Sequence, residues 1–323
     1  MTEGKNLQPI LSVENLKKYF QTSRGSLHAV DNVSFEIQEG QTLGVVGESG
    51  CGKTTTGRTI LRLIEPTSGT IRFDNIDINN LPKNDLRLIR SKMQIIFQDP
   101  YSSLDPRKTV AATISEPLVI HKRVANKREL RERVLALMEM VELEERLYSA
   151  YPHELDGGRR QRIGIARALA LEPKFIVCDE PVSSLDVSVQ AQIINLMQDL
   201  QDKLKLTYMF VTHDMAVVKH ISDEIAVMYL GQIIERAPAK ELFEHQIHPY
   251  TRALIAAIPK MGANLGDLTG TLKGEIGSPI EPKPGCRFAP RCDYCQESCT
   301  RADPPLQDLG AGRYVACWRA SEI

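Results

Sequence analysis

The octapeptide Gly47 to Thr54 places the strongest constraint on how this chain can fold. It reads Gly-Glu-Ser-Gly-Cys-Gly-Lys-Thr and matches the phosphate-loop pattern G-x-x-x-x-G-K-[ST]. The apolar run Thr42 to Val46 before it predicts a buried strand, and a helix is expected to begin near Lys53. The glycines let backbone N–H groups turn inward around a phosphate, and the helix N-terminus adds partial positive charge. A glycine turn that only joins strand and helix is the plainer alternative, and the flanking pattern favours the phosphate loop.

The polar groups of this loop have expected ligands. Lys53 would reach the β- and γ-phosphates of a nucleoside triphosphate, and the Thr54 hydroxyl would ligate Mg²⁺. The sequence therefore predicts ATP as the substrate and Mg²⁺ as its metal. The loop residues expected to bind them are Gly47, Ser49, Gly50, Cys51, Gly52, Lys53, Thr54 and Thr55.

A second apolar run, Phe175 to Asp179, ends in a pair of carboxylates. Such a run is typical of a parallel core strand, and an Asp at its carboxyl end is where the Mg²⁺ shell needs an oxygen ligand. Asp179 is therefore expected to bind Mg²⁺, and Glu180 to polarise the attacking water. An isolated Asp-Glu pair is often a solvated turn, but a phosphate loop upstream favours the catalytic interpretation.

Two polar side chains after other predicted strands complete the candidate site. His213 follows the apolar run Thr207 to Thr212, and Gln98 follows Met93 to Phe97. A neutral imidazole could touch the γ-phosphate and align the water, while an amide could sense Mg²⁺ and the same water. Taken alone, either residue would more often be structural.

Other segments outline the rest of the fold. Residues 11–46 and 70–78 are predicted as β-structure, and Lys127 to Leu147 has helical spacing. A helical stretch, Val189 to Leu204, separates two core strands, so a right-handed parallel crossover is expected. After about residue 260, prolines, glycines and cysteines crowd a loop-rich appendage.

The charge and hydropathy patterns argue against several protein classes. The formal net charge is −1 over 323 residues, which disfavours a generally basic nucleic-acid binder. No apolar run reaches the roughly 18–20 residues that a membrane span needs, and Met1 to Ile10 lacks the apolar core of a signal peptide. A cytoplasmic protein that associates with a membrane through a partner is therefore expected.

Six motifs occur in the order found in ATP-binding cassettes, the nucleotide-hydrolysing subunits of ABC transporters. They are the loop 47–54, Gln98 in Phe-Gln-Asp-Pro, the segment Leu155–Arg159, Asp179-Glu180, Ser184-Leu185-Asp186 and His213. The chain resembles this family over about residues 10–260. The resemblance implies an α/β fold: a P-loop NTPase cassette in residues 1–260, with a mixed core sheet, an antiparallel β subdomain and a helical insertion at about 105–165. Residues 261–323 are expected to form a loop-rich, cysteine-containing C-terminal appendage.

The resemblance adds residues that the loop pattern does not reveal. Phe20 lies where an aromatic ring of this family stacks on adenine, with neighbouring Tyr19 as its rival. In this family ATP is bound between the phosphate loop of one subunit and the signature segment of another, so dimerisation is part of the mechanism. Asp186 would lie in the loop that crosses between the paired subunits.

The signature segment departs from the family pattern Leu-Ser-Gly-Gly-Gln. It reads Leu155-Asp156-Gly157-Gly158-Arg159, so a carboxylate stands where the family's serine donates a hydrogen bond to the partner's γ-phosphate. Two like charges about 4 Å apart repel by roughly 4 kcal/mol at an effective dielectric constant of about 20. This signature is therefore expected to complete a weak or silent site, while the chain's own Glu180 and His213 serve a competent one. The alternative is that Asp156 rotates away or is screened, and Arg159 would offset part of the repulsion.

Three segments resemble the oligopeptide/dipeptide (and nickel) importers of the family: Gln98–Arg107, His248–Leu254 and the cysteine tail. This resemblance implies ATP-driven import of di- or oligopeptides at the cytoplasmic face of the cell membrane. The implied partners are a paralogous ATPase subunit, two membrane permeases and, indirectly, an extracytoplasmic binding protein, with no nucleic acid. The alternative is a soluble ABC-type ATPase in DNA repair or translation, which would usually carry coiled coils or basic surfaces.

Five of the seven cysteines lie in the tail, spaced Cys286-x5-Cys292-x6-Cys299-x17-Cys317 with Cys295 as an extra. A reducing cytosol disfavours disulfides, so the clustered thiols suggest either zinc or a [4Fe–4S] cluster. Only Cys292 and Cys295 have the spacing of a zinc knuckle, and the more even gaps favour the cluster. The tails of the resembling importers also suggest iron–sulfur, with Cys286, Cys292, Cys299 and Cys317 as ligands. Zinc and free or disulfide-bonded thiols remain the alternatives.

Overall fold

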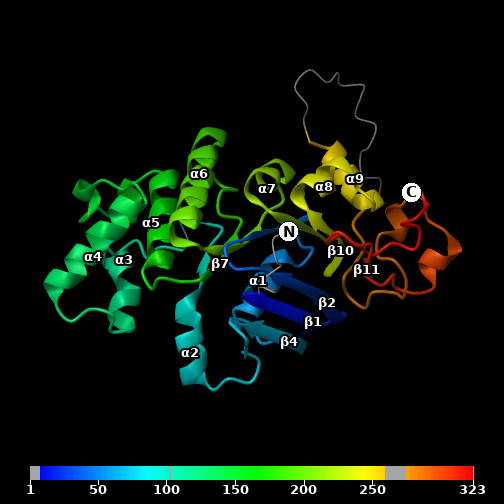
Figure 1. Cartoon of the computed structure of the whole chain (residues 1–323), viewed down its shortest axis with the longest axis horizontal. Helices are drawn as coiled ribbons and strands as arrows, with labels where there is room; N and C mark the ends of the chain where they lie inside the picture. Colours follow the sequence, from blue (N-terminus) through cyan, green and yellow to red (C-terminus); the bar gives the residue numbers. More distant parts are fainter. Residues whose placement is uncertain (1–7, 100, 102, 259–273, 323) are drawn as a thin grey trace, which may run out of the picture. The chain divides into compact units, whose positions relative to one another are not determined.

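A computed structural model describes residues 8–99, 101, 103–258 and 274–322 of the chain (Figure 1). It divides into two compact units, the first built from residues 1–38, 42–80 and 210–323, and the second from 39–41 and 81–209. No helix within the described ranges is long and apolar enough to cross a membrane. Pro100 and Ser102 of the segment Gln98–Arg107, and the predicted boundary after residue 260, lie outside the described residues.

The first unit contains an antiparallel sheet, as predicted for an antiparallel β subdomain. Its strand order is β2-β1-β4-β5, and Leu11 pairs with both Ile37 and Phe73. The alternating side chains Val33, Phe35 and Ile37 are buried, because every second residue of a strand faces the same side. The strands are β1 (Leu11–Thr22), β2 (Gly25–Ile37), β4 (Ser68–Phe73) and β5 (Ile76–Asp77).

A mixed sheet forms the other part of the first unit. The predicted buried strand before the phosphate loop is β3 (Thr42–Val46), and all five of its residues are buried. It runs parallel to β9, while β9–β10, β10–β12 and β12–β11 are antiparallel. The strands are β9 (Glu224–Tyr229), β10 (Gln232–Pro238), β11 (Gln307–Asp308) and β12 (Tyr314–Val315), and the helices of this unit are α1 (Lys53–Ile60), α7 (Met215–Ile221), α8 (Ala239–Glu244) and α9 (Pro249–Ala256).

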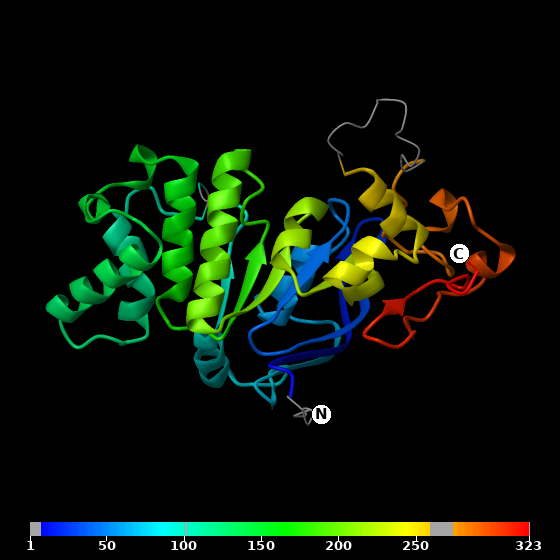
Figure 2. The same ribbon diagram turned by 45° about the horizontal axis from the view of Figure 1, so that its top comes forward.

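The second unit joins parallel strands to a group of helices. Strand β6 (Met93–Ile96) runs parallel to β7 (Phe175–Asp179), and β8 (Thr207–Val211) begins in this unit beside β7. Helices α3, α4, α5 and α6 pack on one another, as Figures 1 and 2 show in green. The helices are α2 (Lys83–Lys92), α3 (Val110–Ile120), α4 (Lys127–Met140), α5 (Gly157–Leu169) and α6 (Val187–Leu204).

The C-terminal segment, residues 274–322, is loop-rich as predicted and is fastened to the first unit. Its strand β12 extends the mixed sheet, with Val315 opposite Glu235 of β10. Phe288 is 3% exposed and packs edge-on against Tyr229, with ring centroids 5.4 Å apart, and against Tyr250 at 5.5 Å. Figure 2 shows this segment, in orange and red, beside the yellow helices α8 and α9. The appendage therefore completes a hydrophobic core of the first unit rather than folding around one of its own.

Candidate functional site

The phosphate loop connects β3 to α1 through glycines that no other residue could replace without strain. Gly47, Gly50 and Gly52 have φ values of 153°, 79° and 106°. A Cβ on Gly47 would lie 2.1 Å from the Met228 carbonyl oxygen, and one on Gly52 would lie 2.0 Å from the Ala29 oxygen. Gly52 is the N-cap of α1 and makes no side-chain cap bond, and the first N–H groups of a helix are those that bind an anion at its N-terminus.

Lys53, the first residue of α1, folds back over this loop. Its ammonium Nζ donates hydrogen bonds to the carbonyl oxygens of Gly47 at 2.7 Å and Glu48 at 3.0 Å. The residue is 5% exposed. The neighbouring Cys51 thiol is also buried, and that burial raises its pKa. The Lys53 ammonium is therefore fixed against the loop backbone, while the buried Cys51 thiol stays neutral and fills space.

The aromatic pair on β1 lies on the half-exposed part of the hairpin with β2. The Tyr19 ring stacks on His28, with ring centroids 3.9 Å apart, and its hydroxyl donates to the Asp31 carboxylate at 2.5 Å. Burial and the Asp31 hydrogen bond raise the pKa of Tyr19, so it stays a neutral donor. The Lys18 ammonium lies 4.7 Å from the centroid of the Phe20 ring. The assignment of Phe20 as the adenine-stacking ring stays a prediction.

His213 lies where the strand β8 gives way to helix α7. It is exposed, and the next residue, Asp214, caps α7 by accepting N–H bonds from Ala216 at 2.7 Å and Val217 at 3.4 Å. The helix cap fixes the backbone immediately after the imidazole. The placement at the carboxyl end of a core strand is the one expected from the sequence.

In the second unit, Gln98 and Glu180 are brought together. The Gln98 amide Nε2 donates to the Glu180 carboxylate Oε2 at 2.8 Å. Glu180 has φ of 49°, in the left-handed region, directly after Asp179, which is 1% exposed at the end of β7. A left-handed backbone in a non-glycine residue costs about 1–2 kcal/mol, and such conformations cluster at functional sites. The strand end therefore presents one buried carboxylate, Asp179, and one hydrogen-bonded carboxylate, Glu180. Their roles in Mg²⁺ binding and water activation stay predictions.

The signature segment begins α5, and its departure from the family pattern has a local structural role. Asp156 is the N-cap of α5, and its Oδ1 accepts the Arg159 N–H at 2.8 Å. Its other oxygen, Oδ2, lies 3.4 Å from the Arg159 guanidinium, which also approaches Glu144 at 3.6 Å. A Ser would cap this helix equally well, so the cap does not explain the aspartate. The two residues that differ from the family pattern, Asp156 and Arg159, therefore form a hydrogen bond and an ion pair with each other.

The other candidate dimer residue, Asp186, caps α6. Its Oδ1 accepts the Val189 N–H at 3.0 Å and the Ser188 hydroxyl at 2.7 Å. These bonds hold the pKa of the Asp186 carboxyl below its ordinary value. Asp186 is therefore a charged residue at an exposed helix start, where an approaching chain could contact it.

Four of the five tail cysteines line one small pocket, together with His248, Phe288 and Trp318. The four are Cys286, Cys292, Cys299 and Cys317, while Cys295 is exposed. Burial and the nearby Cys299, Cys292 and Cys317 groups raise the pKa of Cys286 to about 12. The four cysteines that the family resemblance implied as ligands therefore line one pocket, and their binding of a metal stays a prediction.

Two family models match this chain. Residues 30–183 match "ABC transporter", and residues 234–299 match "Oligopeptide/dipeptide transporter, C-terminal region". The dipeptide transport ATP-binding protein DppF of Haemophilus influenzae is 46% identical over 325 residues, covering 98% of each chain. The chain belongs to the ABC transporter family.

Other relatives agree with this assignment to the ATP-binding subunits of the family. The oligopeptide transport ATP-binding protein AppF of Bacillus subtilis is 46% identical over 323 residues, which cover 97% of this chain and 98% of that protein. Among solved structures, the dimeric ATP-binding cassette MJ0796 bound to ADP and Pi matches with a TM-score of 0.66 and 33% identity, over 71% of this chain and 98% of that one. Cassette cbiO1 of Clostridium perfringens has the same TM-score at 30% identity, over 79% and 97%. The match to these cassettes confirms the predicted α/β cassette fold, and as a family member the chain is an ABC-type ATPase.

The site residues of this ATP-binding subunit divide between its two units. The first unit holds Phe20, the phosphate loop with Lys53, and His213, whereas the second holds Gln98, Asp179, Glu180, the signature and Asp186. Contacts that the sequence did not reveal also emerge. Two tail arginines on either side of Phe288 bind carboxylates near the phosphate loop: Arg287 binds Asp31, and Arg291 binds Glu48. The sequence offers one signal for these arginines, which is that each is adjacent to a tail cysteine. Their partners lie more than 240 residues away.

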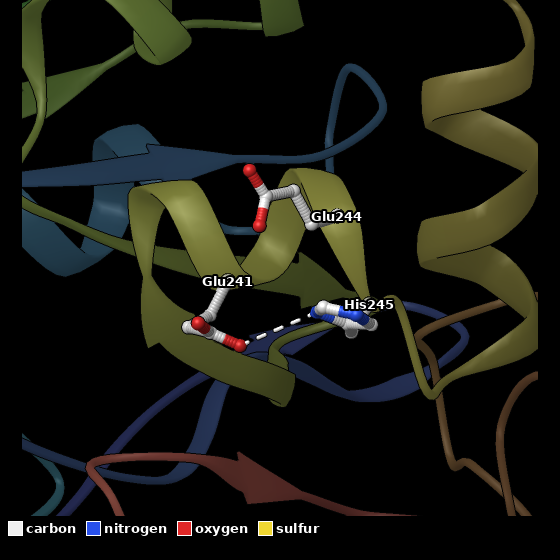
Figure 3. Close-up of side chains that lie close together, drawn as sticks. All are labelled: Glu241, Glu244 and His245. Carbon is white, nitrogen blue, oxygen red and sulfur yellow. Dashed lines mark ion pairs between the residues drawn. The ribbon is translucent and has the colours of Figure 1, made fainter.

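One exposed cluster of this subunit resembles a cation site. Figure 3 shows Glu241, Glu244 and His245 at the end of α8, and their ligand atoms lie within 4.8 Å of one another. Glu241 and His245 form an i,i+4 ion pair at 3.4 Å, with side chains 41% and 65% exposed. The arrangement is that of an ordinary solvated helix face, where such pairs add a few tenths of a kcal/mol.

Proposed function

We propose that this chain is the ATP-hydrolysing subunit of a transporter that imports di- or oligopeptides. The observation that carries the proposal is the presence on one chain of the ABC transporter match and the oligopeptide/dipeptide transporter C-terminal region. Relatives named for dipeptide and oligopeptide transport align over 98% and 97% of the chain. The test is uptake of labelled di- and oligopeptides by cells with and without this chain. Unchanged peptide uptake in the deleted strain would argue against the substrate class.

In this proposal the first unit supplies the groups that bind the nucleotide, and each unit supplies one candidate Mg²⁺ ligand. Lys53 contacts the β- and γ-phosphates once they replace its two carbonyl acceptors, and Phe20 stacks on adenine. The Thr54 hydroxyl and the Asp179 carboxylate are hard oxygen donors of the kind that Mg²⁺ prefers. Mg²⁺ bound with the nucleotide would neutralise charge on the transferred phosphoryl group.

In this proposal Glu180, Gln98 and His213 carry out the hydrolytic step. Glu180 accepts a proton from the attacking water, and Gln98 orients its carboxylate through the 2.8 Å hydrogen bond. His213 aligns the water against the γ-phosphate. Because Gln98 also follows a core strand, it is the group through which the state of the nucleotide could be passed to a permease.

Dimerisation with a paralogous ATPase subunit belongs to the proposal. The similar cassette MJ0796 was solved as a dimer. Asp156, 60% exposed at its side chain, would place a carboxylate against the partner's ATP, and its pairing with Arg159 offsets part of that charge. A heterodimer with one weak site therefore fits best, working at the cytoplasmic face of the membrane on two permeases fed by an extracytoplasmic binding protein.

Replacing Asp156 with Ser is expected to raise ATP turnover of the heterodimer by about fivefold. The full repulsion of roughly 4 kcal/mol applies to an unscreened pair, and exposure together with Arg159 reduces it to about 1 kcal/mol. Ser keeps the helix cap, so stability should not change. Turnover is measured on the assembled transporter, with Asp202→Ser, an exposed aspartate of α6, as the matched control. Equal turnover in the Asp156→Ser and parent transporters would remove the case for a weak site.

The tail cysteines fit a [4Fe–4S] cluster better than zinc. A tetrahedral zinc with Zn–S bonds of about 2.3 Å holds its sulfurs about 3.8 Å apart. Within the described residues, the cluster of Glu241, Glu244 and His245 is the one group of three or more potential ligands that lie within 4.8 Å of one another. No three of the four pocket thiols meet that spacing, so we propose that the pocket holds a body of several irons rather than one zinc ion. Such a cluster would cross-link a segment that has little regular structure.

Anaerobically purified protein is therefore expected to show a visible absorbance band with about four irons and about four sulfides per chain. Cys292→Ser should lose the band, because Cys292 lines the pocket. Cys295→Ser, an exposed neighbour, is the matched control and should keep it. A colourless protein that carries zinc would contradict the cluster.

The alternative, a soluble ABC-type ATPase in DNA repair or translation, is not favoured. The C-terminal match to the peptide-transporter region and the near-zero net charge both count against it.

A further inference from the structure

The tail segment between Cys286 and Cys292 places an arginine against Glu48 of the phosphate loop. The Arg291 guanidinium donates to both oxygens of the Glu48 carboxylate, at 2.8 and 3.1 Å. The Arg291 side chain is 5% exposed and that of Glu48 is 21% exposed. A bidentate pair of this kind fixes direction as well as charge, because the planar guanidinium matches the carboxylate.

Glu48 is held at its backbone as well as at its side chain. Its N–H donates to the Tyr250 hydroxyl of α9 at 2.9 Å, and the Arg291 Nη1 also lies 3.3 Å from the Tyr229 hydroxyl. The rings of Tyr229 and Tyr250 both pack against Phe288, three residues before Arg291. The loop position is thus fastened to the tail by one ion pair, one N–H bond and a shared aromatic core.

A second arginine of the same segment, Arg287, anchors the tail to Asp31 of β2 and to Leu230, which follows β9. It donates to the Asp31 carboxylate and to the Leu230 carbonyl oxygen. The next residue, Gly231, accepts the Asp31 N–H at 2.8 Å and donates its own N–H to the Cys51 oxygen at 2.8 Å. Burial opposes it, but the Tyr19 hydrogen bond and the Arg287 charge hold the pKa of Asp31 below its ordinary value. The anchor therefore lies one hydrogen bond from the phosphate loop.

Glu48 poses an electrostatic problem that Arg291 resolves. A carboxylate in a loop that surrounds a polyphosphate repels the ligand that the loop must bind. The Arg291 cation neutralises that carboxylate and turns it toward the tail. We infer that Arg291 is a positioning residue for ATP binding, which acts through Glu48 and makes the phosphate loop depend on the folded cysteine segment. The inference rests on ATP binding by this family member, and it stands apart from the identity of the transported substrate and of any metal.

The test is the ATP affinity of the full-length chain, measured by titration with Mg-ATP. Arg291→Met is expected to raise the ATP Kd at least tenfold, because it leaves the Glu48 charge facing the phosphates. Adding Glu48→Gln to this variant should restore most of the affinity. In the assembled transporter, KM for ATP should rise while kcat stays within about threefold of the parent. Arg301→Met is the matched control, since Arg301 pairs with Glu297 in the same segment but with side chains 71% and 79% exposed.

A purely structural role predicts a different pattern. It would lower the melting temperature of Arg291→Met without raising the Kd of the folded protein, or it would give a raised Kd that Glu48→Gln does not rescue, and either result overturns the inference. If Arg291→Met does not fold, the variant that combines Arg291→Met with Glu48→Gln tests the inference instead. A double variant that folds and binds ATP within threefold of the parent supports the inference, and one that fails to fold or binds tenfold more weakly overturns it.

Discussion

Replacing Glu180 with Gln is expected to lower kcat for ATP hydrolysis by about 10²–10⁴-fold, the usual contribution of a general base. Glutamine has the same shape and can still accept the hydrogen bond that Gln98 donates at 2.8 Å, but it carries no charge with which to polarise water. The affinity for Mg-ATP should therefore stay within about threefold. Steady-state turnover of the assembled transporter and a nucleotide titration measure the two quantities separately.

The matched control for this substitution is Glu172→Gln. Glu172 lies in the same unit, also has a positive φ, of 54°, and has a side chain 84% exposed with Arg133 at 3.7 Å. The Glu172→Gln substitution makes the same chemical change at a residue with the same left-handed backbone, but away from the end of β7. A Glu180→Gln transporter that keeps more than about a tenth of its turnover would mean that the catalytic base is another residue or that the partner's site does the work.

Local patterns predicted the elements that carry these groups. The run Thr42 to Val46 and the glycines after it specify a strand, a loop and a helix start within fifteen residues, so no distant contact is needed to anticipate them. The same holds for the apolar strand that ends at Asp179. Alternation predicted β-structure within residues 11–46, whereas the antiparallel pairing of β1 and β2 was expected only from the family resemblance.

Residues whose partners lie far along the chain could not be predicted in this way. The ion pair of Glu48 and Arg291 joins positions 243 residues apart, and nothing in either neighbourhood marks the other. A local role can also escape a sequence pattern: Arg159 was expected to offset the Asp156 charge, but the Asp156 cap of the Arg159 N–H at the start of α5 was not anticipated. The family resemblance implied the four cysteines of the pocket, whereas the separation between their sulfurs, which distinguishes zinc from a cluster, is a property of the folded segment.

Replacing Gly52 with Ala is expected to destabilise the protein by about 2–5 kcal/mol and to abolish ATP binding. The residue has φ of 106°, which costs an L-residue about 1–2 kcal/mol, and its new Cβ would lie 2.0 Å from the Ala29 carbonyl oxygen. Relieving that overlap adds about 1–3 kcal/mol of overpacking strain. The free energy of unfolding in urea and the ATP Kd measure the two effects.

Gly40→Ala is the control that separates backbone strain from collision. Gly40 has φ of 79°, yet a Cβ there meets nothing within 4 Å, so this variant should lose only about 1–2 kcal/mol and keep ATP binding. The Ala29 carbonyl cannot easily retreat from Gly52, because its strand is tied to the turn that holds the loop: Asp31 donates to the Gly231 oxygen, and Gly231 donates to the Cys51 oxygen. Equal losses in the two variants would show that this strand does move. The phosphate loop would then owe its shape to its own glycines rather than to the backbone packed against it.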